Sequence, residues 1–281
     1  MNFASILKMM SEQDSEFFEK TSQRRSLLKD FGKKIALTAV PFALGSLFTK
    51  AYGQNGRGSA RSTDSILEVL NFALTLEYLE RDFYKQALDN NAGMPFIPAA
   101  QLAGIQSIYQ HEAAHVSFLV AAIQGAGGTP VSGLTFDFTA GGAFPGATSS
   151  YNMFLAVAQT FEDTGVRAYK GRAGELMGDN AVLTAALNIH SVEARHASHI
   201  RMVRKNNTGD PLVAGNPKPW ITGNASNVGT TAVQASYNGE EITQQAGVNI
   251  AGFVSGDAAS ESFDEPLTKD QVLAIVDPFI N

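Results

Sequence analysis

Two copies of the pattern Glu-x-x-His are the part of the sequence best suited to chemistry. The first copy consists of Glu112 and His115, and the second consists of Glu193 and His196. A helix has 3.6 residues per turn, so residues three apart lie on one face, about 4.5 Å apart along the axis. Each pair can therefore present one carboxylate and one imidazole to the same metal ion.

Each Glu-x-x-His pair is preceded by a glutamate within an apolar stretch. Glu77 and Glu162 lie 35 and 31 positions before the glutamates of the two pairs, and each has a tyrosine seven residues further on, Tyr84 and Tyr169. These spacings suit a hairpin of two long helices joined by a short turn, so the chain repeats one hairpin twice. Four carboxylates and two imidazoles on four helices can bind two metal ions in the core of a bundle.

Apolar residues recur at helical spacing in four segments, which predicts helices over about 63–90, 98–124, 151–177 and 180–206. Residues 126–148 contain six glycines and two prolines. They predict a long crossover loop between helices 2 and 3, with a short extended piece at 134–138. The sequence thus predicts an all-α fold, a four-helix bundle over residues 61–206.

Residues 1–53 are predicted to form a signal peptide. Arg24 and Arg25 precede an apolar run over 35–48. The paired arginines resemble the twin-arginine signal, so we expect the twin-arginine translocation machinery as a partner and a periplasmic or extracellular location. An apolar run of about fourteen residues falls short of the roughly 20 that span a bilayer. Retention on the membrane by an uncleaved signal is the alternative.

Residues 207–281 differ sharply in composition, being rich in Gly, Asn, Thr, Ser and Pro. Thr268 and Gln271 have the spacing of a capping box, which predicts one short helix near the end. The segment is predicted to be an irregular C-terminal extension that packs on the bundle. The aromatic side chains expected to make that contact are Trp220, Phe253, Phe263 and Phe279.

Residues 61–206 resemble a ferritin-like domain, and the whole chain resembles the bacterial relatives of plant desiccation-related proteins. The resemblance implies two iron or manganese ions as cofactors. The ligands it implies are Glu77, Glu112, His115, Glu162, Glu193 and His196. Glu112 and Glu193 would bridge the two ions, while one further glutamate and one histidine complete each shell. Tyr84 and Tyr169 would form hydrogen bonds near the cluster.

Composition excludes several other classes of site. The chain has no cysteine, which rules out disulfides, zinc–thiolate sites, iron–sulfur clusters and cysteine nucleophiles. The net charge is −6, and residues 54–281 contain 13 basic and 22 acidic residues. Such an acidic body is predicted not to bind nucleic acid.

Other charged residues near the motifs are expected to have ordinary roles. Glu80 and Asp163 are predicted to lie on solvated faces of their helices, and Arg167 and Arg195 are predicted to form only salt bridges. The remaining histidines are predicted to be surface or hydrogen-bonded residues, with support for the ligands or an added ligand as the functional alternative. They are His111, His190 and His199.

Two classes of function stay open at this point. Carboxylate-bridged redox metals suit catalase-, peroxidase- or ferroxidase-like chemistry on a small oxidant, dioxygen or hydrogen peroxide, in oxidative or desiccation stress. The alternative is a non-catalytic metal-binding or stress-protection protein that uses the bundle as a scaffold. A homo-oligomer is compatible with either.

Overall fold

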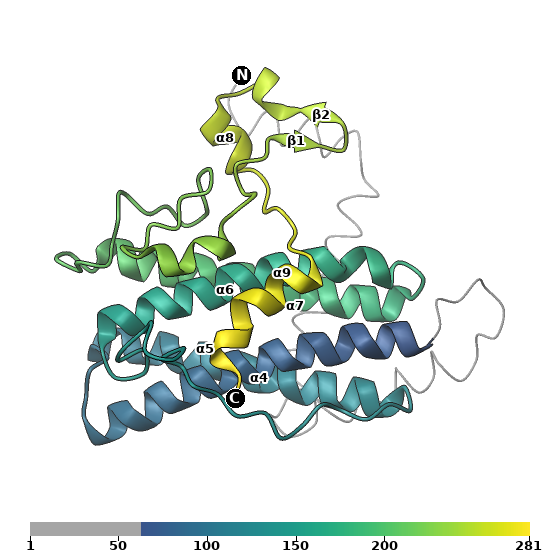
Figure 1. The fold of residues 1–281 in the computed structure, drawn as a ribbon, viewed down its shortest axis with the longest axis horizontal. Coiled ribbons are helices and arrows are strands. Elements are labelled where there is room, and N and C mark those ends of the chain that lie inside the picture. The colour runs from purple at the N-terminus through teal and green to yellow at the C-terminus, as the bar shows by residue number, and fades with distance from the viewer. Residues whose placement is uncertain (1–62) are drawn as a thin grey trace, which may run out of the picture.

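The computed structural model describes residues 63–281, so the predicted signal peptide lies outside the described residues. Four long helices form a bundle (Figure 1): α4 (Thr63–Gly93), α5 (Ala99–Gly125), α6 (Tyr151–Ala173) and α7 (Asn180–Asn206). The prediction of an all-α bundle is confirmed. Within residues 63–281, none of the helices combines the length and the apolar composition needed to cross a bilayer.

The largest difference from the predicted helix bounds is at the end of the third helix. The α-helix was expected to reach about 177 but ends at Ala173, and the 3₁₀ helix η1 (Gly174–Leu176) follows it. Tight 3₁₀ turns commonly close a helix because they satisfy its last carbonyl groups. Asp179 then caps α7, its carboxylate accepting hydrogen bonds from the backbone N–H groups of Ala181 and Val182 at 3.0 Å each.

The bundle consists of two helical hairpins, α4 with α5 and α6 with α7, which meet mainly through α4 and α6. Helix α6 is buried on all sides from Phe154 to Tyr169. An aromatic cluster joins the hairpins, since the ring of Phe83 lies 5.3 Å from that of Phe154 and 5.1 Å from that of Phe161. Such close aromatic pairs add stability beyond the area they bury.

The crossover loop runs along the bundle and pairs with the C-terminus. Phe136, within the extended piece expected at 134–138, forms an isolated bridge with Ile280. The backbone N–H of Asp137 donates to the carbonyl of Phe279, and that of Asn281 donates to the carbonyl of Thr135, both at 2.9 Å. The two longest irregular segments therefore stabilise each other.

The C-terminal extension contains short elements only. They are η2 (Thr231–Ser236), β1 (Gln244–Gln245), β2 (Val248–Asn249), η3 (Ile250–Gly252), α8 (Gly256–Ser260), α9 (Lys269–Val276) and η4 (Asp277–Phe279). The capping box predicted from Thr268 and Gln271 is present at the start of α9. Helices α9 and η2 lie against α6, whereas β1, β2 and α8 project away from the bundle (Figure 1).

The extension contacts the bundle differently from the way its aromatic residues suggested. Phe279 is buried, but Trp220, Phe253 and Phe263 are 48%, 80% and 38% exposed, so that prediction was wrong for three of the four. Backbone contact takes their place. A Cβ atom at Gly171 of α6 would lie 1.9 Å from the carbonyl oxygen of Leu267, so the extension approaches closer there than any side chain allows.

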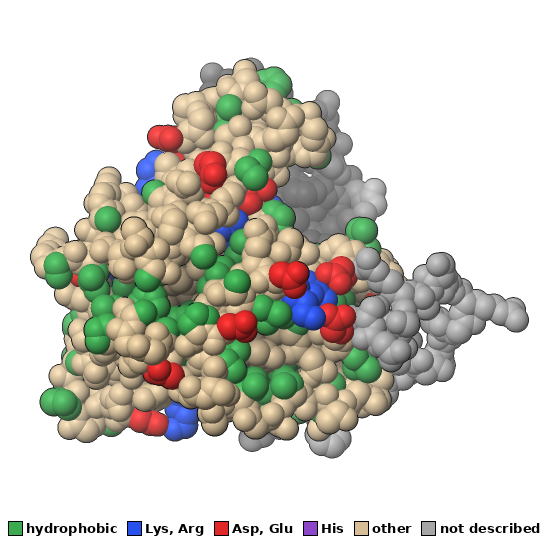
Figure 2. Space-filling model, in the orientation of Figure 1, with side chains coloured by type: hydrophobic (Ala, Val, Ile, Leu, Met, Phe, Trp, Pro, Cys, Tyr) green, Lys and Arg blue, Asp and Glu red, His purple; other side chains and the backbone are tan. Residues whose placement is uncertain are grey.

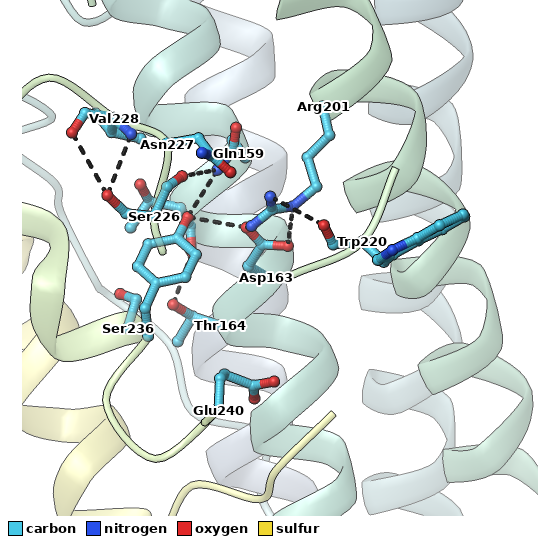
Figure 3. Close-up of polar contacts among 12 residues, drawn as sticks. Gln159, Asp163, Thr164, Arg201, Trp220, Ser226, Asn227, Val228, Ser236 and Glu240 are labelled. Carbon is cyan, nitrogen blue, oxygen red and sulfur yellow. Dashed lines mark hydrogen bonds and ion pairs between the residues drawn. The ribbon is translucent and has the colours of Figure 1, made fainter. Parts of the chain in front are cut away.

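Buried polar side chains complete the attachment (Figure 3). Arg201 of α7 forms an ion pair with Asp163 of α6, at 2.6 and 3.0 Å from its two carboxylate oxygens. The hydroxyl of Tyr237 in the extension donates to the same carboxylate at 2.8 Å. Asp163 was predicted to be solvated and is buried instead, because the extension covers the outer face of α6.

A second buried ion pair joins α6 to the extension, and it predicts that the stability of the protein depends on pH. Nε of Arg167 lies 2.6 Å from a carboxylate oxygen of Glu240, whose other oxygen has no hydrogen-bond partner among the described residues. Burial raises the pKa of Glu240 to about 7 against the opposing charge of Arg167. The folded chain therefore binds this proton more tightly than the unfolded chain does.

Because of that difference, the contribution of Glu240 to the free energy of unfolding should decrease as the pH rises from about 4.5 to about 7. Replacing Glu240 with Gln removes this titration. We expect the free energy of unfolding of the wild type, relative to the variant, to fall by about 2 kcal/mol between pH 5 and pH 7.5, measured by urea denaturation. Glu241→Gln, at the exposed neighbouring position, is the control. A wild-type-to-variant difference that is constant with pH would contradict the assignment.

Candidate metal centre

The six residues singled out from the sequence lie together in the middle of the bundle. Helix α4 contributes Glu77, α5 contributes Glu112 and His115, α6 contributes Glu162, and α7 contributes Glu193 and His196. The four glutamates are fully buried and the two histidines nearly so. Their nitrogen and oxygen atoms form two groups of four residues, and within each group these atoms lie within 4.8 Å of one another.

Glu112 and Glu193 belong to both groups. Nδ1 of His115 lies 3.0 Å from Oε2 of Glu112 and 3.1 Å from Oε1 of Glu193. Nδ1 of His196 lies 2.7 Å from Oε1 of Glu112 and 3.7 Å from Oε2 of Glu193. Each of these two carboxylates thus directs one oxygen to either half of the cluster, as a ligand shared between two ions does.

Each half also has one glutamate of its own. Oε2 of Glu77 lies 3.1 Å from Nδ1 of His115, and Oε2 of Glu162 lies 3.3 Å from Nδ1 of His196. The halves are therefore equivalent in composition. Each has the two shared carboxylates, one imidazole and one carboxylate that belongs to that half only, Glu77 or Glu162, which we call its private carboxylate. This equivalence reflects the repeated hairpin in the sequence.

Several of the buried atoms have no hydrogen-bond partner among the described residues, although other atoms of the cluster lie close to them. They are Oε1 of Glu112, Oε2 of Glu162, both carboxylate oxygens of Glu193 and Nδ1 of His196. Such orphaned polar atoms are rare and costly in protein interiors. Here they converge on common points, and their oxygen and imidazole chemistry suits iron or manganese. The residues present therefore fit a two-metal centre.

The electrostatics of the cluster point the same way. Burial raises the pKa of Glu112 well above its ordinary value and that of Glu162 to about 7. Burial acts likewise on Glu193, but close contacts with the two histidines lower its pKa to about 2. Burial opposes protonation of His196, yet the surrounding carboxylates raise its pKa to about 12. The buried carboxylates therefore favour positive charge beside them, which bound metal ions would supply.

The two tyrosines cross between the hairpins. The hydroxyl of Tyr84 on α4 donates to Oε1 of Glu162 on α6, and that of Tyr169 on α6 donates to Oε1 of Glu77 on α4, both at 2.5 Å. Each private glutamate therefore has one oxygen bound by a tyrosine and the other directed into the cluster. The tyrosines orient these carboxylates, as outer partners of metal ligands do.

Comparison with known proteins agrees with this geometry. A family model described as a ferritin-like domain matches residues 65–206, half of the chain. The chain belongs to the ferritin-like domain family. A search of the curated proteins gave no match. The residues matched span all four bundle helices and all six residues of the cluster.

Glu80 is, after Asp163, the second acidic residue of the ferritin-like domain whose burial was not predicted from the sequence. It was predicted to be solvated but is 3% exposed, and burial together with the charge of Glu193 raises its pKa well above the ordinary value. Its position one turn after Glu77 is made possible by Gly165 of α6, where a Cβ atom would come within 3.0 Å of Oε1 of Glu80. Glu80 belongs to neither group of converging ligand atoms.

Of the three remaining histidines, His111 contacts the cluster directly. Its Nδ1 lies 2.9 Å from Nε2 of His196, and the two rings stack at 5.2 Å. His190 instead contacts the carbonyl of Val166 on α6. His111 is exposed, and no histidine is visible on the face that Figure 2 shows. It supports the ring orientation of His196 from the surface.

Proposed function

We propose that the ferritin-like domain binds two iron or manganese ions and uses them in redox chemistry on dioxygen or hydrogen peroxide. The observation that carries the proposal is the pair of shared carboxylates, Glu112 and Glu193, each with one oxygen toward either half of the cluster. The complete ligand set is Glu77, Glu112, His115, Glu162, Glu193 and His196. Two ions that each change by one electron supply the two electrons that reduce dioxygen to peroxide or peroxide to water.

The surrounding residues fit this use. Tyr84 and Tyr169 hold protons on hydroxyl oxygens that face the private carboxylates, where they orient Glu162 and Glu77. The apolar walls of the bundle exclude bulk water from the cluster, which strengthens the electrostatic interactions inside it. The chain's own contribution is therefore a preorganised, dry site of fixed ligand geometry.

Export is part of the proposal and rests on the pattern around Arg24 and Arg25. A twin-arginine route carries proteins that are already folded, so the ions would be loaded before translocation. An exported protein of this kind would meet oxidants outside the cytoplasm, which is why we propose a role in oxidative or desiccation stress.

The experiment is to purify the full chain with no metal added and to quantify bound metals by elemental mass spectrometry. About two iron or manganese ions per chain, with turnover of dioxygen or peroxide, is the expected result. Less than about 0.2 ions per chain, not restored by adding either metal, would overturn the proposal. Two bound ions without turnover of either oxidant would refute the catalytic part and leave a metal-binding function.

A further inference from the structure

A small cavity lies between the four bundle helices, beside the half of the centre that contains Glu77. Its volume is about 20 Å³, and its lining includes Ala73, Leu76, Leu119, Tyr169, Ala186 and Ile189. A cavity must offer roughly 10–15 Å³ to the centres of water-sized molecules before it holds one. This cavity therefore admits one very small molecule and excludes larger organic compounds.

The chemistry of the lining selects among small molecules. Among the described residues, Tyr169 and Arg172 are its only polar side chains. The tyrosine hydroxyl donates to Glu77, and the guanidinium of Arg172 pairs with Glu175 at 2.7 Å and lies over the ring of Phe72, 5.2 Å from its centre. What faces the cavity is hydrocarbon. A water molecule there would lack partners, whereas apolar cavities of proteins stay dry and take up apolar guests such as xenon.

The position of Tyr169 connects the cavity to the centre. The tyrosine lines the cavity, and its hydroxyl donates to Oε1 of Glu77, the residue that follows Leu76 of the cavity wall. The equivalent residue of the other hairpin, Tyr84, packs against Phe83 and Phe154 at ring distances of 5.4 and 5.9 Å. The two tyrosines therefore have different surroundings, since aromatic rings pack against Tyr84 and the cavity lies against Tyr169.

From this asymmetry we infer that the cavity binds dioxygen and supplies it to the Glu77–His115 half of the centre. The inference rests on the proposed function and narrows it, because a polar oxidant such as hydrogen peroxide gains no hydrogen bonds in an apolar cavity. Beside the Glu162–His196 half, aromatic rings pack against Tyr84 in the place where the cavity lies against Tyr169.

Xenon is the probe, since it binds in apolar cavities without needing a metal. Crystals of the full chain pressurised with xenon should show the atom beside Tyr169. In Ala186→Phe, a larger side chain at this half-buried position of the lining should fill the space and abolish xenon binding. Ala181→Phe, on the same helix but exposed, should retain it. Circular dichroism and metal content check that both variants fold and load.

The second measurement compares oxidants in the iron(II)-loaded protein. Ala186→Phe should slow oxidation by dioxygen and leave oxidation by hydrogen peroxide unchanged, whereas Ala181→Phe should change neither rate. No xenon in the wild type, or an unchanged dioxygen rate in a variant that has lost xenon, would overturn the inference. If the chain binds xenon beside Tyr169 but binds neither iron nor manganese, the proposed function is wrong. The assignment of the cavity to an apolar guest would stand.

Discussion

Replacing Glu193 with Gln should reduce the bound metal from about two ions per chain to less than about 0.2, because this carboxylate serves both halves of the cluster. Glutamine keeps the size of the side chain but not its charge or its two equivalent oxygens. The same substitution at Glu77, which belongs to one half only, should leave about one ion. Elemental mass spectrometry after dialysis measures both.

Glu80→Gln is the matched control for this series. Glu80 lies on the same helix as Glu77, one turn further on, and is also buried, yet its oxygens do not belong to either group of converging atoms. We expect this variant to retain about two ions per chain. Equal losses in the Glu77 and Glu80 variants, or two ions retained without the Glu193 carboxylate, would contradict the ligand assignment.

Replacing Arg201 with Met should lower the free energy of unfolding by about 3–5 kcal/mol, which corresponds to a melting temperature lower by roughly 10 °C. The reason is that Asp163 would remain buried without its cation, and of the side chains in the described part of the chain only the hydroxyl of Tyr237 would still donate to it. Because that carboxylate also contacts the extension, the damage should include the attachment of residues 207–281. Urea denaturation and thermal melts followed by circular dichroism measure the loss.

A double variant separates the unpaired charge from the lost packing. Asp163→Asn combined with Arg201→Met removes both charges and leaves an acceptor for Tyr237, so it should recover most of the stability. The exposed pair of Lys85 and Asp89, at 2.6 Å, is the comparison: Lys85→Met should change the melting temperature little, because exposed pairs are solvated and screened. A double variant no more stable than Arg201→Met would contradict the explanation.

Helical periodicity explains why the positions of the cluster could be predicted. Glu112 with His115, and Glu193 with His196, are separated by three residues, and this spacing places each pair on one helical face whatever surrounds it. Glu77 and Glu162 each lie in an apolar stretch, so burial of that face carries the carboxylate inward. The tyrosines two turns further along were expected near the cluster, but their crossing between hairpins depends on how α4 packs against α6.

Asp163 and Glu80 show where periodicity fails. A periodic pattern identifies the helix face that turns toward the bundle core. Where another segment covers the opposite face as well, as the extension covers α6, apolar residues occur on both faces and the period is lost. The available signal was the run over residues 153–161, which contains no charged side chain, since a helix that is apolar all round is buried all round. For Glu80 the corresponding signal was Gly165, whose missing side chain makes room on the neighbouring helix.

The sequence by itself determined the helices, the repeated hairpin and the two local Glu-x-x-His pairs, because each depends on spacing within one segment. Only the tertiary structure decided which carboxylates are shared, which tyrosine bonds which glutamate, and where the extension lies. These depend on contacts between residues 70 to 100 positions apart, such as Tyr169 with Glu77 and Arg167 with Glu240. Such contacts follow from the packing of whole helices, for which no local pattern carries a signal.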